Sequence, residues 1–169
     1  MIATILLFSM PYVRSFYTHS SGIIIRNPHI HDVGVMVQIE EQSFGDPWSA
    51  ETLRETIECF YETSFCAVAG GRVISFVICG IEHTGSGIYG HICNIATEPR
   101  YRNLGIGKDL IRHAETAVIA REATAMQLEV RESNALAQQF YLKLSYRPVC
   151  VFQSYYANGE DALFMMKWF

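Results

Sequence analysis

The hydrophobic pattern of the first half of the chain predicts two helices and an antiparallel meander. Residues 31–44 carry apolar side chains at helical spacing, and Ser49 can cap a second helix in which Leu53 and Ile57 recur at that spacing. The predicted buried side of the first helix comprises Val33, Met36, Val37 and Phe44. Gly70-Gly71 suits a two-residue hairpin turn with positive φ. The predicted strands are 22–26, 64–69, 73–81 and 88–97.

The second half changes from this meander to an alternation of strands and helices. Helices are predicted over 105–122 and 134–144, and strands over 125–131, 146–153 and 161–168. Hairpins followed by a strand–helix–strand crossover predict an α/β sheet of mixed direction. We expect one domain over 22–169, preceded by an N-terminal extension over 1–21.

Composition and charge narrow the class of protein. The 169 residues are 50% hydrophobic, enough for one domain with a real core. The net charge of −4 argues against a nucleic-acid binder, so a bound anion must be held by local geometry. The five cysteines form no CxxC pair, and we expect buried, reduced thiols. The scattered histidines predict no metal site.

The first ten residues raise the question of targeting. Their apolar stretch is shorter than the ~20 residues that span a bilayer, and no basic leader precedes it. We therefore expect a cytoplasmic protein without a membrane segment, with Met10 as a second candidate translation start.

The stretch 98–111 holds the clearest candidate binding motif. Gly105 and Gly107 lie at a predicted strand-to-helix turn, where backbone N–H groups can approach an anion without a side chain in the way. Arg100, Arg102 and Lys108 add local positive charge. The stretch matches neither a Walker A loop nor GxGxxG, so the corresponding nucleotide sites are disfavoured. A tight turn that only starts a helix is the alternative.

The spacing Arg102-x-x-Gly105-x-Gly107 resembles the acetyl-CoA pyrophosphate loop of the GNAT acetyltransferases. A second block strengthens the resemblance: Leu128-Glu-Val-Arg-Glu-Ser-Asn134, then Ala137 and Phe140-Tyr-Leu-Lys-Leu144. Further matching residues are Phe44, Pro47-Trp48-Ser49 and Tyr155-Tyr156-x-x-Gly159-Glu-Asp-Ala162. Together they are similar to the protein N-terminal acetyltransferases, including the bacterial ribosomal-protein alanine acetyltransferases and their archaeal relatives, over residues 22–169.

This resemblance implies a GNAT fold, a mixed central sheet splayed at the acetyl-CoA site with helices on both faces. It implies acetyl-CoA as the cosubstrate and no metal. The implied cofactor-binding residues are Ile95, Ala96, Thr97, Arg102, Asn103, Leu104, Gly105, Ile106, Gly107, Lys108, Asn134, Tyr141 and Lys143. The implied catalytic residues are Glu129, Tyr141 and His91, and those implied to line the amine entrance are Glu129, Tyr155 and Tyr156.

The chemistry of acyl transfer supports part of this assignment independently. The reaction needs a neutral amine, a donor at the carbonyl oxygen and a proton for the departing thiolate. Glu129 alternates with Leu128 and Val130 in a predicted strand, and burial strengthens a carboxylate as a base. A Glu129 that is exposed or paired with Arg131 is the alternative. For Tyr141, His91 and the Tyr155-Tyr156 pair, the alternative is ordinary packing within the fold.

Two segments depart from the family pattern. The helix after Asn134 ends in Leu144-Ser145-Tyr146, where the family usually has Leu-Gly-Phe, and a left-handed Ser145 costs about 1 kcal/mol. The segment 44–48 resembles the bacterial enzymes and lacks the Pro-Glu-Asn-Tyr type of segment of archaeal and eukaryotic relatives. The substrate preference therefore stays open.

We predict an enzyme that transfers acetyl from acetyl-CoA to the N-terminal α-amine of a protein by direct attack in a ternary complex. The expected partners are protein N-termini, with ribosomal proteins among the candidates, and neither nucleic acid nor membrane. An acetyltransferase for lysine or small-molecule amines is one alternative. A CoA-binding regulatory subunit without turnover is the other.

Overall fold

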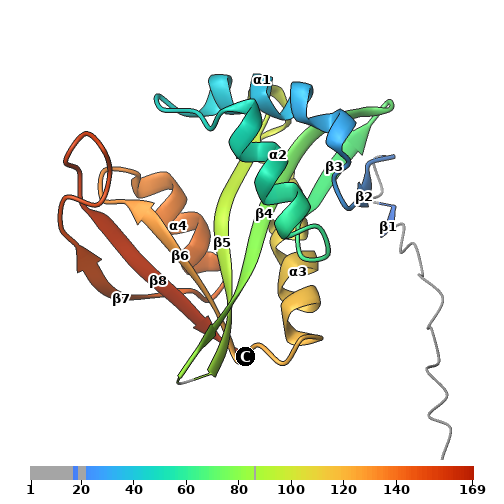
Figure 1. Cartoon of the computed structure of the whole chain (residues 1–169). Helices are drawn as coiled ribbons and strands as arrows, with labels where there is room; N and C mark the ends of the chain where they lie inside the picture. The colour runs from blue at the N-terminus through green and yellow to red at the C-terminus, as the bar shows by residue number, and fades with distance from the viewer. Residues whose placement is uncertain (1–16, 19–21, 86) are drawn as a thin grey trace, which may run out of the picture.

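The computed structural model describes residues 17–18, 22–85 and 87–169. Within these ranges the chain forms one mixed sheet in the order β1-β2-β3-β4-β5-β6-β8-β7 (Figure 1). Neighbouring strands are antiparallel except β5 and β6, which are parallel. The strands are β1 (Tyr17–Thr18), β2 (Ile24–Arg26), β3 (Phe65–Ala69), β4 (Arg72–Thr84), β5 (Gly87–Thr97), β6 (Ala125–Arg131), β7 (Arg147–Phe152) and β8 (Ala162–Trp168).

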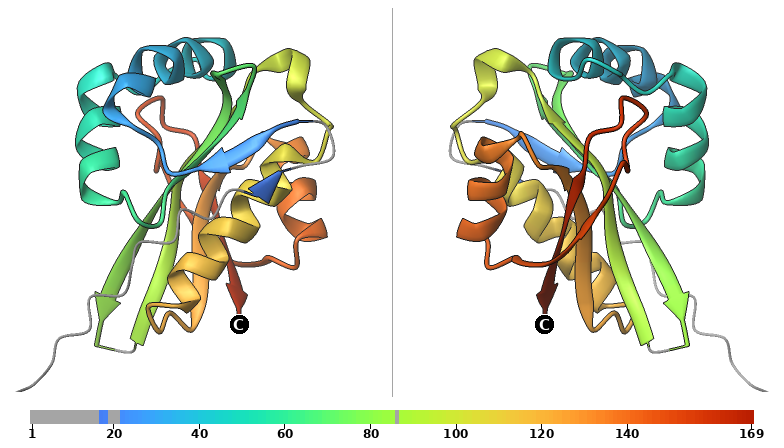
Figure 2. Two further views of the ribbon diagram at one scale, coloured as in Figure 1. Left: turned by 90° about the vertical axis from the view of Figure 1, so that its right-hand side faces the viewer. Right: turned by 90° about the vertical axis from the view of Figure 1, so that its left-hand side faces the viewer.

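Helices cover both faces of this sheet, as the family resemblance implies (Figure 2). α1 and α2 pack on one face, and α3 and α4 lie on the other. The helices are α1 (Val33–Ser43), α2 (Ala50–Cys59), α3 (Ile106–Ile119) and α4 (Ala135–Lys143), with 3-10 turns η1 (Ile30–Asp32) and η2 (Pro99–Tyr101). The predicted α/β fold of mixed direction is therefore confirmed.

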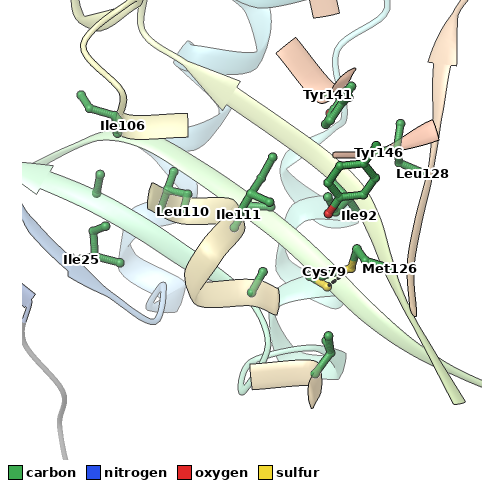
Figure 3. Close-up of a cluster of buried hydrophobic side chains, with 14 of the residues drawn as sticks. Ile25, Cys79, Ile92, Ile106, Leu110, Ile111, Met126, Leu128, Tyr141 and Tyr146 are labelled. Carbon is green, nitrogen blue, oxygen red and sulfur yellow. Dashed lines mark hydrogen bonds between the residues drawn. The ribbon is translucent and has the colours of Figure 1, made fainter. Parts of the chain in front are cut away.

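The two faces bury separate apolar clusters. The larger lies between the sheet and α3 with α4, and Figure 3 shows its centre. Leu110 and Ile111 of α3 belong to the same buried cluster as Met126 and Leu128 of β6. The smaller cluster joins α1 and α2 to β3–β5, with Met36 and other side chains fully buried. Burial of apolar surface on both faces holds the sheet rigid, which the site requires.

The parallel strands β5 and β6 separate halfway along their length. Their pairing runs from Tyr89–Ala125 to Ile92–Leu128 and then stops, although both strands continue. At the same level the β4–β5 register shifts between Ile78 and Cys79, which leaves Cys93 as an extra residue in β5. Such a bulge bends a strand and redirects its side chains. The sheet is therefore splayed where the resemblance places acetyl-CoA.

Local sequence signals predicted the element ends closely. The Ser49 side chain accepts the Thr52 N–H at 3.1 Å, and Gly70 and Gly71 have φ of 56° and 80°, as the hairpin requires. α3 ends at Ile119, before residue 122, because Glu122 takes a left-handed φ of 65°. Ser145 also has a positive φ, 74°, so the predicted conformational free-energy cost of a left-handed serine applies here.

Two predictions of burial are wrong. Phe44 is 37% exposed because α1 ends at Ser43, and Ile39 and Glu40 complete the buried side instead. Cys59 and Cys150 are exposed, at the end of α2 and on the outer strand β7, whereas Cys66 and Cys79 are buried. All five cysteines are unpaired, and all lie in the described part of the chain.

The expected extension, residues 1–21, lies outside the described residues except for Tyr17 and Thr18. Their backbone adds the short strand β1 beside β2. The domain boundary at residue 22 stays a prediction.

Candidate active site

A pocket of about 300 Å³ opens where β5 and β6 separate. Its walls come from α1 with the loop that follows, from β5, from β6 with α4, and from the β7–β8 loop. The lining residues are Glu40, Phe44, Asp46, Trp48, Ile92, Cys93, Asn94, Ile95, Glu129, Val130, Arg131, Asn134, Ala137, Tyr141 and Tyr156. Five predicted site residues thus share one pocket: Ile95, Glu129, Asn134, Tyr141 and Tyr156.

Glu129 begins a hydrogen-bonded series of side chains that crosses three strands. Its Oε2 lies 2.8 Å from Nε2 of His91, whose Nδ1 lies 2.6 Å from Oε1 of Glu82. Gln127 donates to Oε2 of Glu82 at 2.8 Å. The exposed fraction rises from 13% for Glu129 to 20% for His91 and 43% for Glu82. The series therefore leads from the pocket to the surface.

The two carboxylates control the charge of His91. Burial alone lowers the pKa of this imidazole, but the hydrogen bond to Glu129 and the charges of Glu129 and Glu82 outweigh it, so the pKa of His91 is raised. The alternative of a Glu129–Arg131 pair is wrong, because Arg131 binds Asp46 and Glu160 instead. Oε1 of Glu129 accepts no hydrogen bond from the described residues and is available to a ligand.

Tyr141 is both a core residue and a pocket residue. Its ring packs against Phe140 and Tyr146, with centroids 5.3 and 5.7 Å apart, at the top of the cluster in Figure 3. Burial raises the pKa of the phenol, so the hydroxyl keeps its proton at neutral pH. No hydrogen bond to this hydroxyl is found among the described residues. The ring of Tyr141 can therefore pack in the core while its hydroxyl serves in the pocket, so the two interpretations are compatible.

The predicted anion-binding turn starts α3. Gly105 has a left-handed φ of 82° and is the N-cap, so the first N–H groups of α3 are left without helical partners. A Cβ at Gly105 meets nothing within 4 Å, whereas one at Gly107 lies 3.4 Å from the Phe140 ring. A Cβ at Gly107 would thus make only an ordinary van der Waals contact, so the packing does not require glycine there. Asn103 also has a positive φ, 62°.

The remaining predicted cofactor residues surround this turn to different degrees. Arg102 donates from Nε to the carbonyl oxygen of Thr97 at 3.0 Å, which ties the turn to the end of β5. Ala96 and Ile106 are buried, and Leu104 is 55% exposed. Asn134 caps α4 by accepting the Ala137 N–H at 3.1 Å. Of the predicted cofactor residues, only Ile95, Asn134 and Tyr141 line the pocket. Lys108 and Lys143 lie outside it and are exposed.

The two tyrosines of the β7–β8 loop occupy different positions. Tyr156 lines the pocket, and burial raises its pKa to about 12 against the opposing charge of Arg131. Tyr155 is 50% exposed and stacks on Phe152 at 6.0 Å. Burial, with the negative charge of Glu129 next, raises the pKa of Tyr155.

Sequence reasoning missed several pocket residues, among them Glu40, Cys93 and Asn94. Glu40 is 1% exposed and accepts the Trp48 N–H at 3.1 Å and the Asn94 amide at 3.0 Å. Burial raises its pKa. Glu40 lies four residues after the apolar Met36, so helical spacing places it on the predicted buried side of α1. This spacing is the sequence signal that could have identified it. Cys93 also lines the pocket, and burial raises the pKa of its thiol to about 11.

Two kinds of feature are absent from the described residues. No helix there is long and apolar enough to cross a membrane. No group of three or more His, Cys, Asp or Glu side chains in this part of the chain is arranged to hold a metal ion.

Comparisons with known proteins agree with this geometry. Residues 34–146 match the acetyltransferase (GNAT) family. A Bacillus subtilis protein named for the alanine N-acetylation of ribosomal protein bS18 is 34% identical over 83% of this chain and 92% of its own. An N-alpha-acetyltransferase of Sulfurisphaera tokodaii is 31% identical over 83% of this chain and 90% of its own length. The crystal structure of the ribosomal-protein-S18-alanine N-acetyltransferase from Escherichia coli is 27% identical, covers 85% and 92%, and has a TM-score of 0.72.

Proposed function

This chain belongs to the acetyltransferase (GNAT) family, and we propose that it transfers an acetyl group from acetyl-CoA to the α-amine of a protein N-terminus. The observation that carries the proposal is that Glu129 and Tyr141 line the same pocket, which opens where β5 and β6 separate. The names of the Bacillus subtilis and Sulfurisphaera tokodaii relatives support the same reaction.

The residues at the start of α3 fit the pyrophosphate of acetyl-CoA, which supplies the activated acetyl thioester. Unpaired N–H groups at a helix start bind anions, and the left-handed Gly105 exposes them in open space. The free edge of β5 beyond Ile92 offers Ile95, Ala96 and Thr97 to the pantetheine arm. Arg102 and Lys108 add positive charge in a chain of net charge −4.

Glu129 is the proposed base. The incoming amine transfers a proton to Oε1 of Glu129, which accepts no hydrogen bond from the described residues, while Oε2 stays bonded to His91. His91 orients the carboxylate and is itself held by Glu82. General base catalysis of this kind contributes ~10²–10⁴-fold.

Tyr141 is the proposed acid. Its phenol keeps the proton because burial raises its pKa, and it donates that proton to the sulfur as the carbon–sulfur bond breaks. The attack is direct, with amine and thioester bound together. Cys93 stays a neutral thiol because its pKa is about 11, and a neutral thiol is a poor nucleophile.

The acceptor follows from amine chemistry. An α-amine has a reference pKa of about 7.7–8.0 and lysine about 10.4. At pH 7 the neutral form therefore costs about 1 kcal/mol for the α-amine and nearly ~5 for lysine, at about 1.36 kcal/mol per pKa unit. A single carboxylate base can therefore deprotonate an α-amine more readily than a lysine side chain. We further propose ribosomal proteins as acceptors and the cytoplasm as the location, since relatives are named for that substrate.

The test compares two peptides of one sequence, one with a free N-terminus and blocked lysines, the other with the reverse. We expect higher kcat/KM on the free N-terminus. Equal or higher kcat/KM on the lysine peptide would favour the lysine or small-amine alternative. CoA binding by calorimetry without acetylation of any peptide or amine would favour the regulatory subunit.

A further inference from the structure

Two loops flank the mouth of the pocket and are joined through one side chain. The α1–α2 loop (residues 44–49) and the β7–β8 loop (residues 153–161) both lie near the end of β6 (Figure 1). Arg131, the last residue of β6, reaches both. Its Nη2 donates to the two oxygens of Asp46 at 2.9 and 2.7 Å, and its Nη1 donates to Oε2 of Glu160 at 2.9 Å.

The β7–β8 end of this bridge is held by further contacts. The Arg131 guanidinium lies 3.8 Å from the centroid of the Tyr156 ring, close enough for a cation–π interaction. The Ser133 hydroxyl and N–H donate to Oε1 of Glu160. Hydrogen bonds from Ser133 and Arg131 lower the pKa of Glu160 to about 2, so the carboxylate is ionised at any working pH.

The bridge depends on the shape of arginine. An exposed ion pair contributes little on its own, and Asp46 is 61% exposed. Here, however, one planar group makes bonds in two directions and stacks on a ring, which an ammonium cannot reproduce. Arg131 itself is 25% exposed, so water screens it only in part.

The bridge spans the place where an acceptor chain enters. Arg131 is two residues after Glu129, so both side chains project from the same face of β6. Asp46, Arg131 and Tyr156 all line the pocket. A first residue whose amine reaches Glu129 therefore passes beneath the two loops.

We propose that Arg131 is a positioning residue that sets acceptor specificity. By fastening the α1–α2 loop to the β7–β8 loop, it fixes the space for the side chain of the acceptor's first residue. This inference rests on the proposed function. The pocket of about 300 Å³ is also lined by Ile95 and Tyr141, on the side proposed for acetyl-CoA. The acetyl group and the first side chain would share this volume, so a fixed bridge favours small first residues.

The test replaces Arg131 by glutamine and measures kcat/KM on two lysine-blocked peptides that differ only in a first alanine or leucine. We expect the ratio of kcat/KM for the alanine peptide to kcat/KM for the leucine peptide to fall at least ~5-fold. This is within the discrimination that one or two methylene groups produce in an apolar pocket. CoA affinity stays unchanged, because the bridge does not contact the α3 turn. Arg54→Gln, on the exposed side of α2, is the matched control and leaves the ratio unchanged.

A double-mutant cycle separates the bridge from general loosening. If Arg131 acts through Asp46, then Arg131→Gln combined with Asp46→Asn changes the ratio no more than either change alone. An active Arg131→Gln variant with the wild-type ratio, or additive effects in the cycle, would overturn the inference. Failure of the wild-type chain to acetylate any free N-terminus would instead count against the proposed function.

Discussion

The Tyr141 hydroxyl combines a raised pKa with the absence of a hydrogen-bond partner among the described residues. Tyr141→Phe therefore removes no contact from the fold, and the ring still packs between Phe140 and Tyr146. We expect kcat to fall by ~10²-fold or more, as loss of a proton donor should, with KM for the peptide little changed. Steady-state kinetics with a thermal melt as control measure both. Unchanged kcat would return Tyr141 to a packing role alone.

His91 predicts a pH dependence of stability. Because its pKa is raised in the folded protein, its protonated form stabilises the fold. This contribution is fully present below the ordinary histidine pKa of about 6.5 and is lost as the pH rises through the folded value. Urea unfolding of wild type and His91→Gln from pH 5.5 to 8.5 should show a difference in unfolding free energy that shrinks as the pH rises.

The control for this experiment is the exposed His31, changed to glutamine in the same way. Its replacement measures the effect of losing a histidine side chain outside the Glu129–His91–Glu82 series. A difference between wild type and His91→Gln that stays constant with pH would contradict the charged state assigned to His91.

The two glycines at the start of α3 differ in what they do for the element. Gly105 needs its left-handed φ, and Gly105→Ala should cost about 1–2 kcal/mol of stability and weaken CoA binding. Gly107 is helical, and an added Cβ makes an ordinary 3.4 Å contact with Phe140, so Gly107→Ala should be tolerated. Calorimetry with CoA on the matched pair checks this. Equal loss of affinity in both variants would place the anion closer to Gly107.

Elements with local signals could be predicted from the sequence, and contacts between distant elements could not. Ser49 and Asn134 predicted the starts of α2 and α4 because each caps an N–H group only three residues further along the chain. His91 and Glu129 are 38 residues apart, and Arg131 and Asp46 are 85 apart. Such pairs depend on sheet order and on the splay of β5 from β6, which no local pattern encodes.

The sheet order places the catalytic pocket far from the N-terminal edge. Three strands, β2 to β4, separate β1 from β5, and strands lie about 4.8 Å apart, so β1 is ~19 Å from the pocket side of the sheet. The helices α1 and α3, which supply the pocket wall and the anion turn, pack on other strands. Changes at the β1 edge should therefore reach the site weakly.

The last prediction concerns residues 1–21. A chain that begins at Gly22 should keep wild-type kcat/KM, because the residues with proposed roles all fall between Phe44 and Glu160. The loss of β1 removes the pairing of Tyr17 with Ile25 and of Thr18 with Ile24, so we expect a small drop in melting temperature. Kinetics and a thermal melt of both chains, with saturating CoA as a control for site integrity, make the comparison. A shortened chain that folds and binds CoA but does not acetylate would show that the extension takes part in the site.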